Sequence, residues 1–196
     1  MSYEMKPLAC DPKKLAGLSE LLILSHYENN YGGAVKRLGA ITEQLRNLNL
    51  LNTPVFVLNG LKREELIATN SMILHEVYFE SMGGIGGMPD GILAEALERD
   101  FGSIERWRYE FVAMGKALGG GSGWVLLTWS PRDRRLVNQW AADHAHALAG
   151  ATPILALDMY EHSYHMDYGA KAAAYVEAFM ANIHWDNVTA KLAAIR

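Results

Sequence analysis

The fold of this chain is decided by one stretch, Leu155-Ala156-Leu157-Asp158-Met159-Tyr160-Glu161-His162-Ser163-Tyr164. An apolar run that begins at Ile154 leads into the carboxylate of Asp158, and the imidazole of His162 follows four residues later. This spacing returns both side chains to one face in either a strand or a helix. Carboxylate oxygen and imidazole nitrogen suit iron, manganese or zinc, so the stretch predicts a metal site.

Composition indicates a soluble globular protein. With 196 residues, of which 50% are hydrophobic, the chain can bury an ordinary core, and its length suggests one or two compact units. A net charge of -4 argues against nucleic acid or an anionic membrane as the main partner. No apolar run approaches the roughly 18 uncharged residues that a membrane span needs.

Cysteine usage and the first residues favour the cytoplasm. Cys10 is the only cysteine, which excludes an internal disulfide and a thiolate cluster for metal. Residues 1–14 carry charge and lack the apolar core of a signal peptide. We therefore expect a cytoplasmic protein that binds neither nucleic acid nor membrane.

The first part of the sequence predicts a helix that carries a histidine. Leu18-Ser19 opens this helix, and His26 follows its apolar residues. The pair Gly32-Gly33 costs about 1 kcal/mol per residue in a helix interior, so a kink or break is expected there. Helical spacing then resumes over 34–48.

A second helix is expected to run antiparallel to the first. Asn59-Gly60 predicts a turn, and 62–79 has helical spacing with His75 in its apolar sector. Two antiparallel helices would face His26 toward His75.

The remaining sequence predicts helices around a small sheet. Its glycine-rich stretch 83–89 cannot continue a helix and is the predicted linker. The predicted elements are helices over 91–101 and 103–118, strands over 124–129, 135–140 and 154–159, and a helical segment over 171–195 with a break near Asn182.

These elements predict the α+β class. We expect an N-terminal α-helical hairpin domain over residues 1–87. An α/β domain with a small three-stranded antiparallel sheet is expected over residues 88–196.

A family resemblance rests on the same stretch. Asp158-Met159-Tyr160-Glu161-His162-Ser163-Tyr164 resembles the Asp-x-Trp-Glu-His-Ala-Tyr signature of the iron/manganese superoxide dismutases. Other landmarks fall in the family's order, namely His26, His75, the block Gly121-Ser122-Gly123-Trp124 and a closing helical segment over 175–185. The resemblance covers essentially the whole chain.

The resemblance implies one iron or manganese ion per subunit, held by His26, His75, Asp158 and His162. The implied reaction converts superoxide to dioxygen and hydrogen peroxide by alternating reduction and oxidation of the ion. One carboxylate and a bound hydroxide keep the oxidised site near neutral, which limits the cost of burying a multivalent charge. Any single histidine has the alternative of being a hydrogen-bonded core residue, but four ligands in family order favour a metal. The sequence does not choose between iron and manganese.

Several positions expected beside the metal depart from the family pattern. Asn30 stands where the family usually has a histidine, and Ala34 stands where it usually has a gateway tyrosine. Loss of that phenol is expected to widen the substrate channel, unless Tyr31 or another aromatic side chain fills the space. Ser71 replaces a glutamine that bonds the metal-bound solvent in iron enzymes, and it is too short to reach directly.

Other positions either offer a replacement for the missing solvent-bonding group or keep the aromatic character of the family pattern. Other family members place a glutamine or histidine near His144 in the solvent-bonding role, but His144 and His146 are equally well read as polar loop residues. Tyr160 replaces the usual tryptophan and Trp124 is unchanged, so both are expected to form an aromatic wall or ordinary core packing.

The resemblance also implies an assembly. Glu161 and Tyr164 match residues that reach across a two-fold interface in the family, the Glu to a histidine ligand of the partner subunit. A homodimer is therefore expected.

Three functions remain open from the sequence. The first is an active superoxide dismutase with altered residues around its metal. The second is a non-catalytic assembly protein on the same fold, which the four retained ligands disfavour. The third is a metal protein whose channel, widened at Ala34, admits a substrate larger than superoxide.

Overall fold

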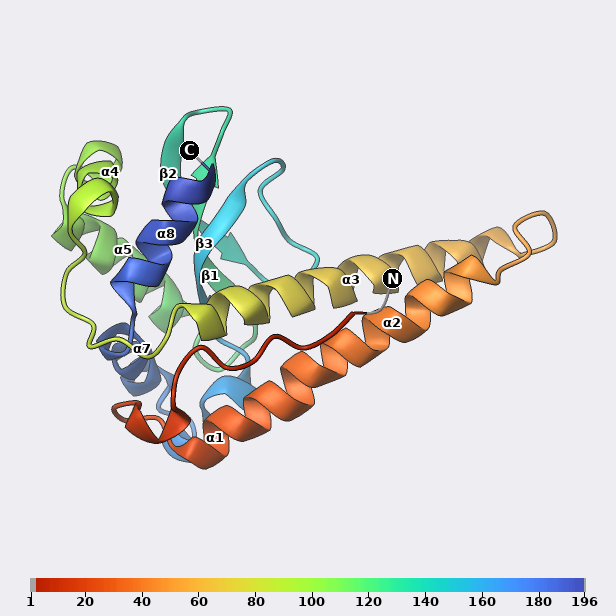
Figure 1. The fold of residues 1–196 in the computed structure, drawn as a ribbon, viewed down its shortest axis with the longest axis horizontal. Coiled ribbons are helices and arrows are strands. Elements are labelled where there is room, and N and C mark those ends of the chain that lie inside the picture. The colour runs from red at the N-terminus through yellow and green to blue at the C-terminus, as the bar shows by residue number, and fades with distance from the viewer. Residues whose placement is uncertain (1–2, 196) are drawn as a thin grey trace.

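The computed structural model describes residues 3–195 and has a helical hairpin followed by helices around a sheet (Figure 1). The helices of the first part are α1 (Glu20–Ser25), α2 (Gly32–Arg46) and α3 (Val55–Glu80). They are followed by α4 (Gly91–Phe101), α5 (Ile104–Ala117), β1 (Trp124–Ser130), β2 (Arg135–Ala141), β3 (Thr152–Asp158), α6 (His165–Tyr168), α7 (Ala172–Ala181) and α8 (Trp185–Ile195). This arrangement confirms the α+β class. Met1, Ser2 and Arg196, at the ends of the two predicted domains, lie outside the described residues.

The first helix does not break at its glycine pair. The Ser19 side chain caps α1 by accepting a hydrogen bond from the Leu22 amide at 3.1 Å. From α1 the chain runs directly into a π-helical turn, η2 (His26–Tyr31), and then into α2 at Gly32. The irregularity therefore lies before Gly32-Gly33, where burial of Tyr31 and other apolar side chains offsets the helical cost of glycine. Such π-helical turns are frequent at functional sites.

The predicted turn at Asn59-Gly60 is wrong, because both residues lie inside α3. The chain reverses earlier, where the Asn49 side chain accepts a hydrogen bond from the Leu51 amide. Pro54 then precedes the first turn of α3. Packing along α2 stabilises the 26-residue helix and outweighs the local turn preference of Asn-Gly. The resulting hairpin projects well beyond the sheet (Figure 1).

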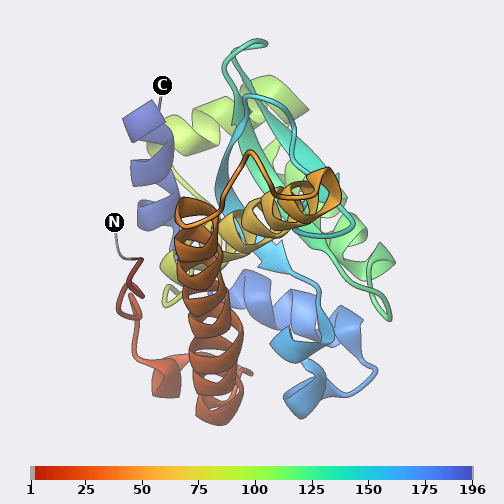
Figure 2. The same ribbon diagram turned by 90° about the vertical axis from the view of Figure 1, so that its right-hand side faces the viewer.

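The three predicted strands form one antiparallel sheet in the order β2-β1-β3. All residues of the central strand β1 are buried, because α5 packs against it while α3 packs against β3. Viewed from the tip of the hairpin, α3 crosses in front of the sheet and α2 lies to the left of the sheet (Figure 2). The two helices pack against each other. The register places Trp124 opposite Asp158, so the end of β3 lies beside the start of β1.

The predicted break near Asn182 is confirmed between α7 and α8. The Asn182 side-chain amide donates to the Ala16 carbonyl and accepts from the Ala16 amide, each at 2.8 Å. The N-terminal arm is thereby joined to the break between the last two helices.

One hydrophobic core includes residues from both predicted domains. Leu22 and Tyr78 from the hairpin belong to the same buried cluster as Trp124 and Tyr175. The division into residues 1–87 and 88–196 stays a prediction. Within the described residues, no helix is long and apolar enough to cross a membrane.

Candidate metal centre

His26 is fully buried in the π-helical turn between α1 and α2. Its ring centroid lies 5.0 Å from the ring centroids of His75, Tyr78 and Phe79 on α3. Burial lowers the pKa of His26, although Asp158 opposes that shift. The imidazole is therefore neutral at physiological pH, which is the form that binds metals.

His75 faces His26 from α3 and is 1% exposed. Its Nδ1 donates to the backbone carbonyl of Ser71 at 2.6 Å, so the ring proton is on Nδ1 and the lone pair is on Nε2. This Nε2 has no hydrogen-bond partner among residues 3–195 and lies 3.6 Å from Asp158 Oδ2. Burial lowers the pKa of His75 to about 3. A buried, unpartnered acceptor is costly unless something binds it, and a metal ion fits that need.

Asp158 ends β3 and is fully buried. Its Oδ2 lies 3.1 Å from His26 Nε2 and 3.2 Å from His162 Nε2. Its Oδ1 accepts a hydrogen bond from the Tyr160 amide at 2.9 Å. Burial by itself raises the pKa of Asp158, but the hydrogen bonds from His162 and His26 outweigh burial and hold the pKa below its usual range. The core therefore contains a carboxylate anion.

His162 lies in the short helix η3 (Glu161–Ser163), which follows β3 almost directly. The Ser163 hydroxyl lies 2.8 Å from the Asp158 carbonyl oxygen and 2.7 Å from that of Tyr160, and it stabilises this turn. The turn aims His162 back at the Asp158 side chain. The His162 side chain is 27% exposed, whereas the other three candidates are buried, so solvent reaches the cluster here.

The structure brings the four predicted ligands together. One ligand atom from each of His26, His75, Asp158 and His162 lies within 4.8 Å of the others. Three imidazole nitrogens and one carboxylate oxygen suit iron or manganese, and they also suit zinc. Because burial keeps His26 and His75 neutral, metal binding does not have to displace protons from charged imidazoles there. The residues present therefore fit the ion that the sequence predicted.

Aromatic side chains form a wall beside this cluster. The Trp124 ring centroid lies 5.3 Å from that of His75, and the Tyr160 ring centroid lies 5.4 Å from that of His162. His144 stacks on Tyr160 at 4.8 Å, and Trp124 Nε1 donates to His144 Nδ1 at 3.0 Å. Because Nδ1 accepts this bond, neutral His144 carries its proton on Nε2.

The structure places the two loop histidines in different surroundings. The His144 ring centroid lies 6.2 Å from that of His75, so His144 is next to the cluster. His146 pairs with Asp143 on the surface, and its side chain is 54% exposed. Ser71, the other departure on α3, has its hydroxyl oxygen 3.4 Å from His75 Nδ1.

Asn30 and Ala34 line an open cavity of about 320 Å³ beside the cluster. The other lining residues are Asn29, Gly33, Arg37, Ile67, Ala68, Ser71 and His144. Tyr31 does not line it, because its hydroxyl donates to Glu76 at 3.1 Å and accepts from the Lys6 amide at 2.8 Å. Tyr31 therefore does not fill the space that the missing phenol leaves.

Of the two residues predicted at a subunit interface, only Glu161 is exposed. Tyr164 is 1% exposed and stacks on Tyr175 at 5.3 Å inside its own subunit. Packing against α7 buries the Tyr164 side chain, and its role at a subunit interface stays a prediction.

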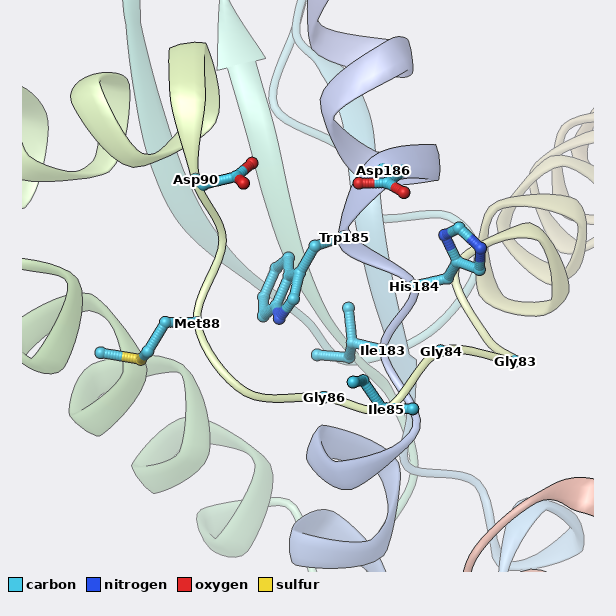
Figure 3. Close-up of a pocket in the computed structure, with 10 residues that line it drawn as sticks. All are labelled: Gly83, Gly84, Ile85, Gly86, Met88, Asp90, Ile183, His184, Trp185 and Asp186. Atoms are coloured by element: carbon cyan, nitrogen blue, oxygen red, sulfur yellow. The ribbon is translucent and has the colours of Figure 1, made fainter.

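Figure 3 shows a larger cavity, of about 440 Å³. It is bounded by the glycine-rich segment and by the start of α8, including Trp185. Asp90 and Asp186 line it with exposed carboxylates. None of the four candidate ligands lines this cavity, so it is separate from the chemistry described above.

Two tyrosines support the centre without any signal in the local sequence. Tyr175 on α7 donates its hydroxyl to the Asp158 carbonyl at 2.8 Å, and the Tyr78 hydroxyl lies 3.3 Å from that of Tyr175. Burial raises the pKa of both phenols, so they remain protonated. Both positions read as ordinary core in the sequence, because nothing in their spacing relates them to Asp158.

Known proteins share this chain's sequence over most of its length. Residues 89–191 match the model described as iron/manganese superoxide dismutases, C-terminal domain. A superoxide dismutase [Fe] of Cupriavidus metallidurans is 76% identical over 99% of this chain and 98% of that protein. Superoxide dismutase [Mn] 2 of Haloferax volcanii is 34% identical over 97% of this chain and 96% of that protein. A superoxide dismutase [Fe] of Aquifex aeolicus is 33% identical over 90% of this chain and 85% of that protein. Together with the His₃Asp cluster, these matches mean that the chain belongs to the iron/manganese superoxide dismutase family.

Proposed function

We propose that this chain is a superoxide dismutase that converts superoxide to dioxygen and hydrogen peroxide. The observation that carries this function is the convergence of three imidazoles on one buried carboxylate. Relatives that span nearly the whole chain carry the same activity in their names. The chain is an oxidoreductase that uses one iron or manganese ion per subunit. A non-catalytic assembly role is not favoured, because all four candidate ligands are present.

We assign the ion to His26, His75, Asp158 and His162. When bound, the ion supplies a one-electron redox couple for the two halves of the reaction. Around it, the Ser71 carbonyl orients His75 and the Tyr160 amide orients Asp158. Such contacts hold ligands in place and adjust the properties of the site.

His144 is the proposed hydrogen-bond donor to solvent or substrate beside the ion. Trp124 holds its Nδ1, so its Nε2–H remains available to donate. Burial lowers the pKa of His144 and raises the pKa of Tyr160 to about 12. Both side chains are therefore uncharged at neutral pH and keep the same donor pattern across the physiological range.

Dismutation per bound metal tests this function. The protein is loaded with iron or with manganese, its metal content is measured, and superoxide decay is followed by stopped flow. We expect activity in at least one form. Decay no faster than that of free superoxide in both loaded forms, with metal present, rejects the proposed function.

We also propose a homodimer in which Glu161 faces the second subunit. Glu161 is exposed next to His162, whose side chain is partly exposed. A two-fold contact at this face brings each Glu161 near the other subunit's metal centre. Sedimentation should give twice the 21.7 kDa mass of one chain. Glu161→Arg should shift the protein toward monomer, whereas Glu105→Arg, at an exposed position of α5, should not.

Two further assignments are retained as proposals. A cytoplasmic location is tested by fractionating the source cells. The division into residues 1–87 and 88–196 is supported by the family match, which begins at residue 89 and describes a C-terminal domain. Circular dichroism of residues 88–196 expressed alone should retain strand and helix signals if this division is correct.

A further inference from the structure

The segment between β2 and β3, residues 142–151, carries His144 and forms no helix or strand. All of its residues from Ala145 to Gly150 are exposed. The hydrogen bond from the Ala145 amide to the Asp143 side chain shapes this segment without joining it to the rest of the molecule. The position of His144 beside the metal centre therefore depends on contacts that the segment makes with other elements.

Close packing does not fix this segment against α3. A cavity of about 190 Å³ lies between the two, and Leu74 of α3 and Leu148 of the segment are among the residues that line it. The open cavity at Ala34 also borders His144. Protein interiors normally hold side chains in place by dense packing, and the two cavities remove that restraint here. A more specific contact has to set the position of His144.

Asn70 on α3 makes such a contact. Its side-chain amide donates to the backbone carbonyl of His144 at 2.6 Å. Asparagine is a weak helix former, because its side chain competes for backbone hydrogen bonds. Its presence inside α3 is therefore not explained by the helix itself, whereas the hydrogen bond to His144 gives it a role.

Asn70 and Trp124 hold His144 at different atoms. Trp124 Nε1 donates to the ring nitrogen Nδ1 at 3.0 Å, and Asn70 donates to the backbone carbonyl. A bond to the ring alone would let the imidazole pivot about Nδ1, whereas the second bond fixes the backbone from which the ring extends. Ser71, the next residue of α3, orients His75 through its own carbonyl. The same turn of α3 therefore sets His144 and His75 relative to each other.

We propose that Asn70 is a positioning residue that keeps the Nε2–H of His144 directed at the space beside the metal ion. Hydrogen bonds weaken steeply when donor and acceptor are misaligned, so a displaced His144 donates poorly. Such a change alters the redox properties of the site although every candidate ligand is kept. This inference rests on the proposed function, in which His144 is the donor, and its test separates the two.

Variants of Asn70 separate its hydrogen bond from its volume. Asn70→Ala should lower dismutation per bound metal about tenfold or more and shift the midpoint potential of the bound ion. Asn70→Leu, which has a similar volume but cannot donate, should lower the rate as much. Alanine and leucine both favour helix, so α3 is kept in either variant. Asn59→Ala, which removes the same amide from an exposed position of α3, is the matched control and should keep the parent rate and potential.

A double-mutant cycle tests whether Asn70 acts through His144. His144→Ala removes the donor itself and should lower the rate. In that background Asn70→Ala should change neither the rate nor the potential any further, because no imidazole remains to be positioned. An equal loss of rate from Asn70→Ala in both backgrounds would show that Asn70 acts by another route and would overturn the inference.

The indole N–H of Trp124 gives a readout that does not depend on activity. Its NMR signal in the zinc-loaded, diamagnetic protein is the one that disappears in Trp124→Phe. The bond to His144 protects this proton, so its hydrogen exchange should accelerate about tenfold or more in Asn70→Ala and stay unchanged in Asn59→Ala. Unchanged exchange in Asn70→Ala, or faster exchange with an unchanged rate, overturns the inference and leaves the proposed function standing. No dismutation by the metal-loaded parent protein rejects the proposed function, and the exchange rate then decides by itself whether Asn70 positions His144.

Discussion

His26, His75 and Asp158 have the charges that a metal site requires before any metal binds. The two histidines are neutral because they are buried, and Asp158 is ionised because imidazoles donate to it. The hydrogen bond from His75 Nδ1 to Ser71 leaves Nε2 as the free nitrogen. Burial and hydrogen bonds therefore give these ligands the charge states that bind a metal. The same charge states make the stability of the metal-free protein sensitive to acid.

Stability of the metal-free protein should fall as pH decreases from neutrality. The pKa of His75 is lowered to about 3 and that of His26 is also lowered, whereas an unfolded histidine titrates near 6.5. Below about pH 6.5 the unfolded state binds more protons, so the free energy of unfolding should drop by about 1.4 kcal/mol per pH unit for each histidine. Urea unfolding between neutral pH and about pH 5 measures this slope.

Two variants test whether His75 contributes to this pH dependence of the free energy of unfolding. His75→Gln should remove one histidine's share of the pH dependence. Gln44→Ala, at an exposed position of α2 and without a titratable group, is the control and should leave the slope unchanged. Equal slopes in the parent protein and His75→Gln would contradict the burial argument.

His162→Ala should abolish metal retention. Three candidate ligands remain in this variant, and the exposed side of the cluster is opened further. Loss of residues that merely support ligands commonly weakens metal binding 10- to 100-fold, so we expect a loss of more than about 100-fold here. Metal analysis after dialysis measures it, with His146→Ala as the control that keeps its metal. Full occupancy in His162→Ala would exclude His162 as a ligand.

Among the elements, α3 positions His75 because it is long and continuous. Its N-terminal half lies along α2, and its C-terminal half packs on β3, so that His75 meets Asp158 at the end of that strand. Predictions from the local sequence succeeded where one short segment decides the outcome, as at Ser19, whose hydroxyl caps α1 by accepting from the Leu22 amide. At Asn59-Gly60 the turn predicted from the local sequence does not form, because α3 continues through these residues and packs against α2.

Gly60→Ala should stabilise the protein by about 1 kcal/mol. Gly60 lies in the interior of α3, and a Cβ there meets nothing within 4 Å. Gly102→Ala should instead destabilise by about 1 kcal/mol, because Gly102 ends α4 with φ +89°. Denaturant midpoints compare the two variants with the parent. A loss of stability in Gly60→Ala would place residue 60 in a turn after all.

For the molecule as a whole, the proposed ion joins parts that are distant in the chain. His26 and His75 come from the helical hairpin, whereas Asp158 and His162 come from the end of the sheet. Binding at this junction stabilises the folded state by about 4 kcal/mol when free metal exceeds its dissociation constant 1,000-fold. For a chain of this size that corresponds to roughly 10 °C in Tm.

Removal of the metal should therefore destabilise the junction between the hairpin and the sheet more than the other parts of the molecule. We expect Tm to fall by about 10 °C after chelation and amide hydrogen exchange to accelerate at residues 26–31 and 158–163. The tip of the hairpin, which is remote from the ligands, should be unchanged (Figure 1). Uniform acceleration along the chain would show that the ion does not act at this junction.

The sequence by itself determined the class and most element boundaries, and its resemblance to the family indicated the four candidate ligands. The class, the boundaries and the Asp158–His162 pair depend on short-range patterns, such as the four-residue spacing of that pair, the apolar run into Asp158 and the cap at Ser19. Such patterns act over a few residues and can be read without knowing what packs against them.

Only the tertiary structure decided which neighbours complete the site. It buried Tyr164, turned Tyr31 toward Glu76 and left the cavity at Ala34 open. It also placed His144 beside the cluster, where Trp124 donates to its Nδ1, and joined Tyr175 to Asp158. The physical reason is that burial and these contacts arise between segments brought together by packing, and their energies exceed the local preferences that a single stretch of sequence expresses.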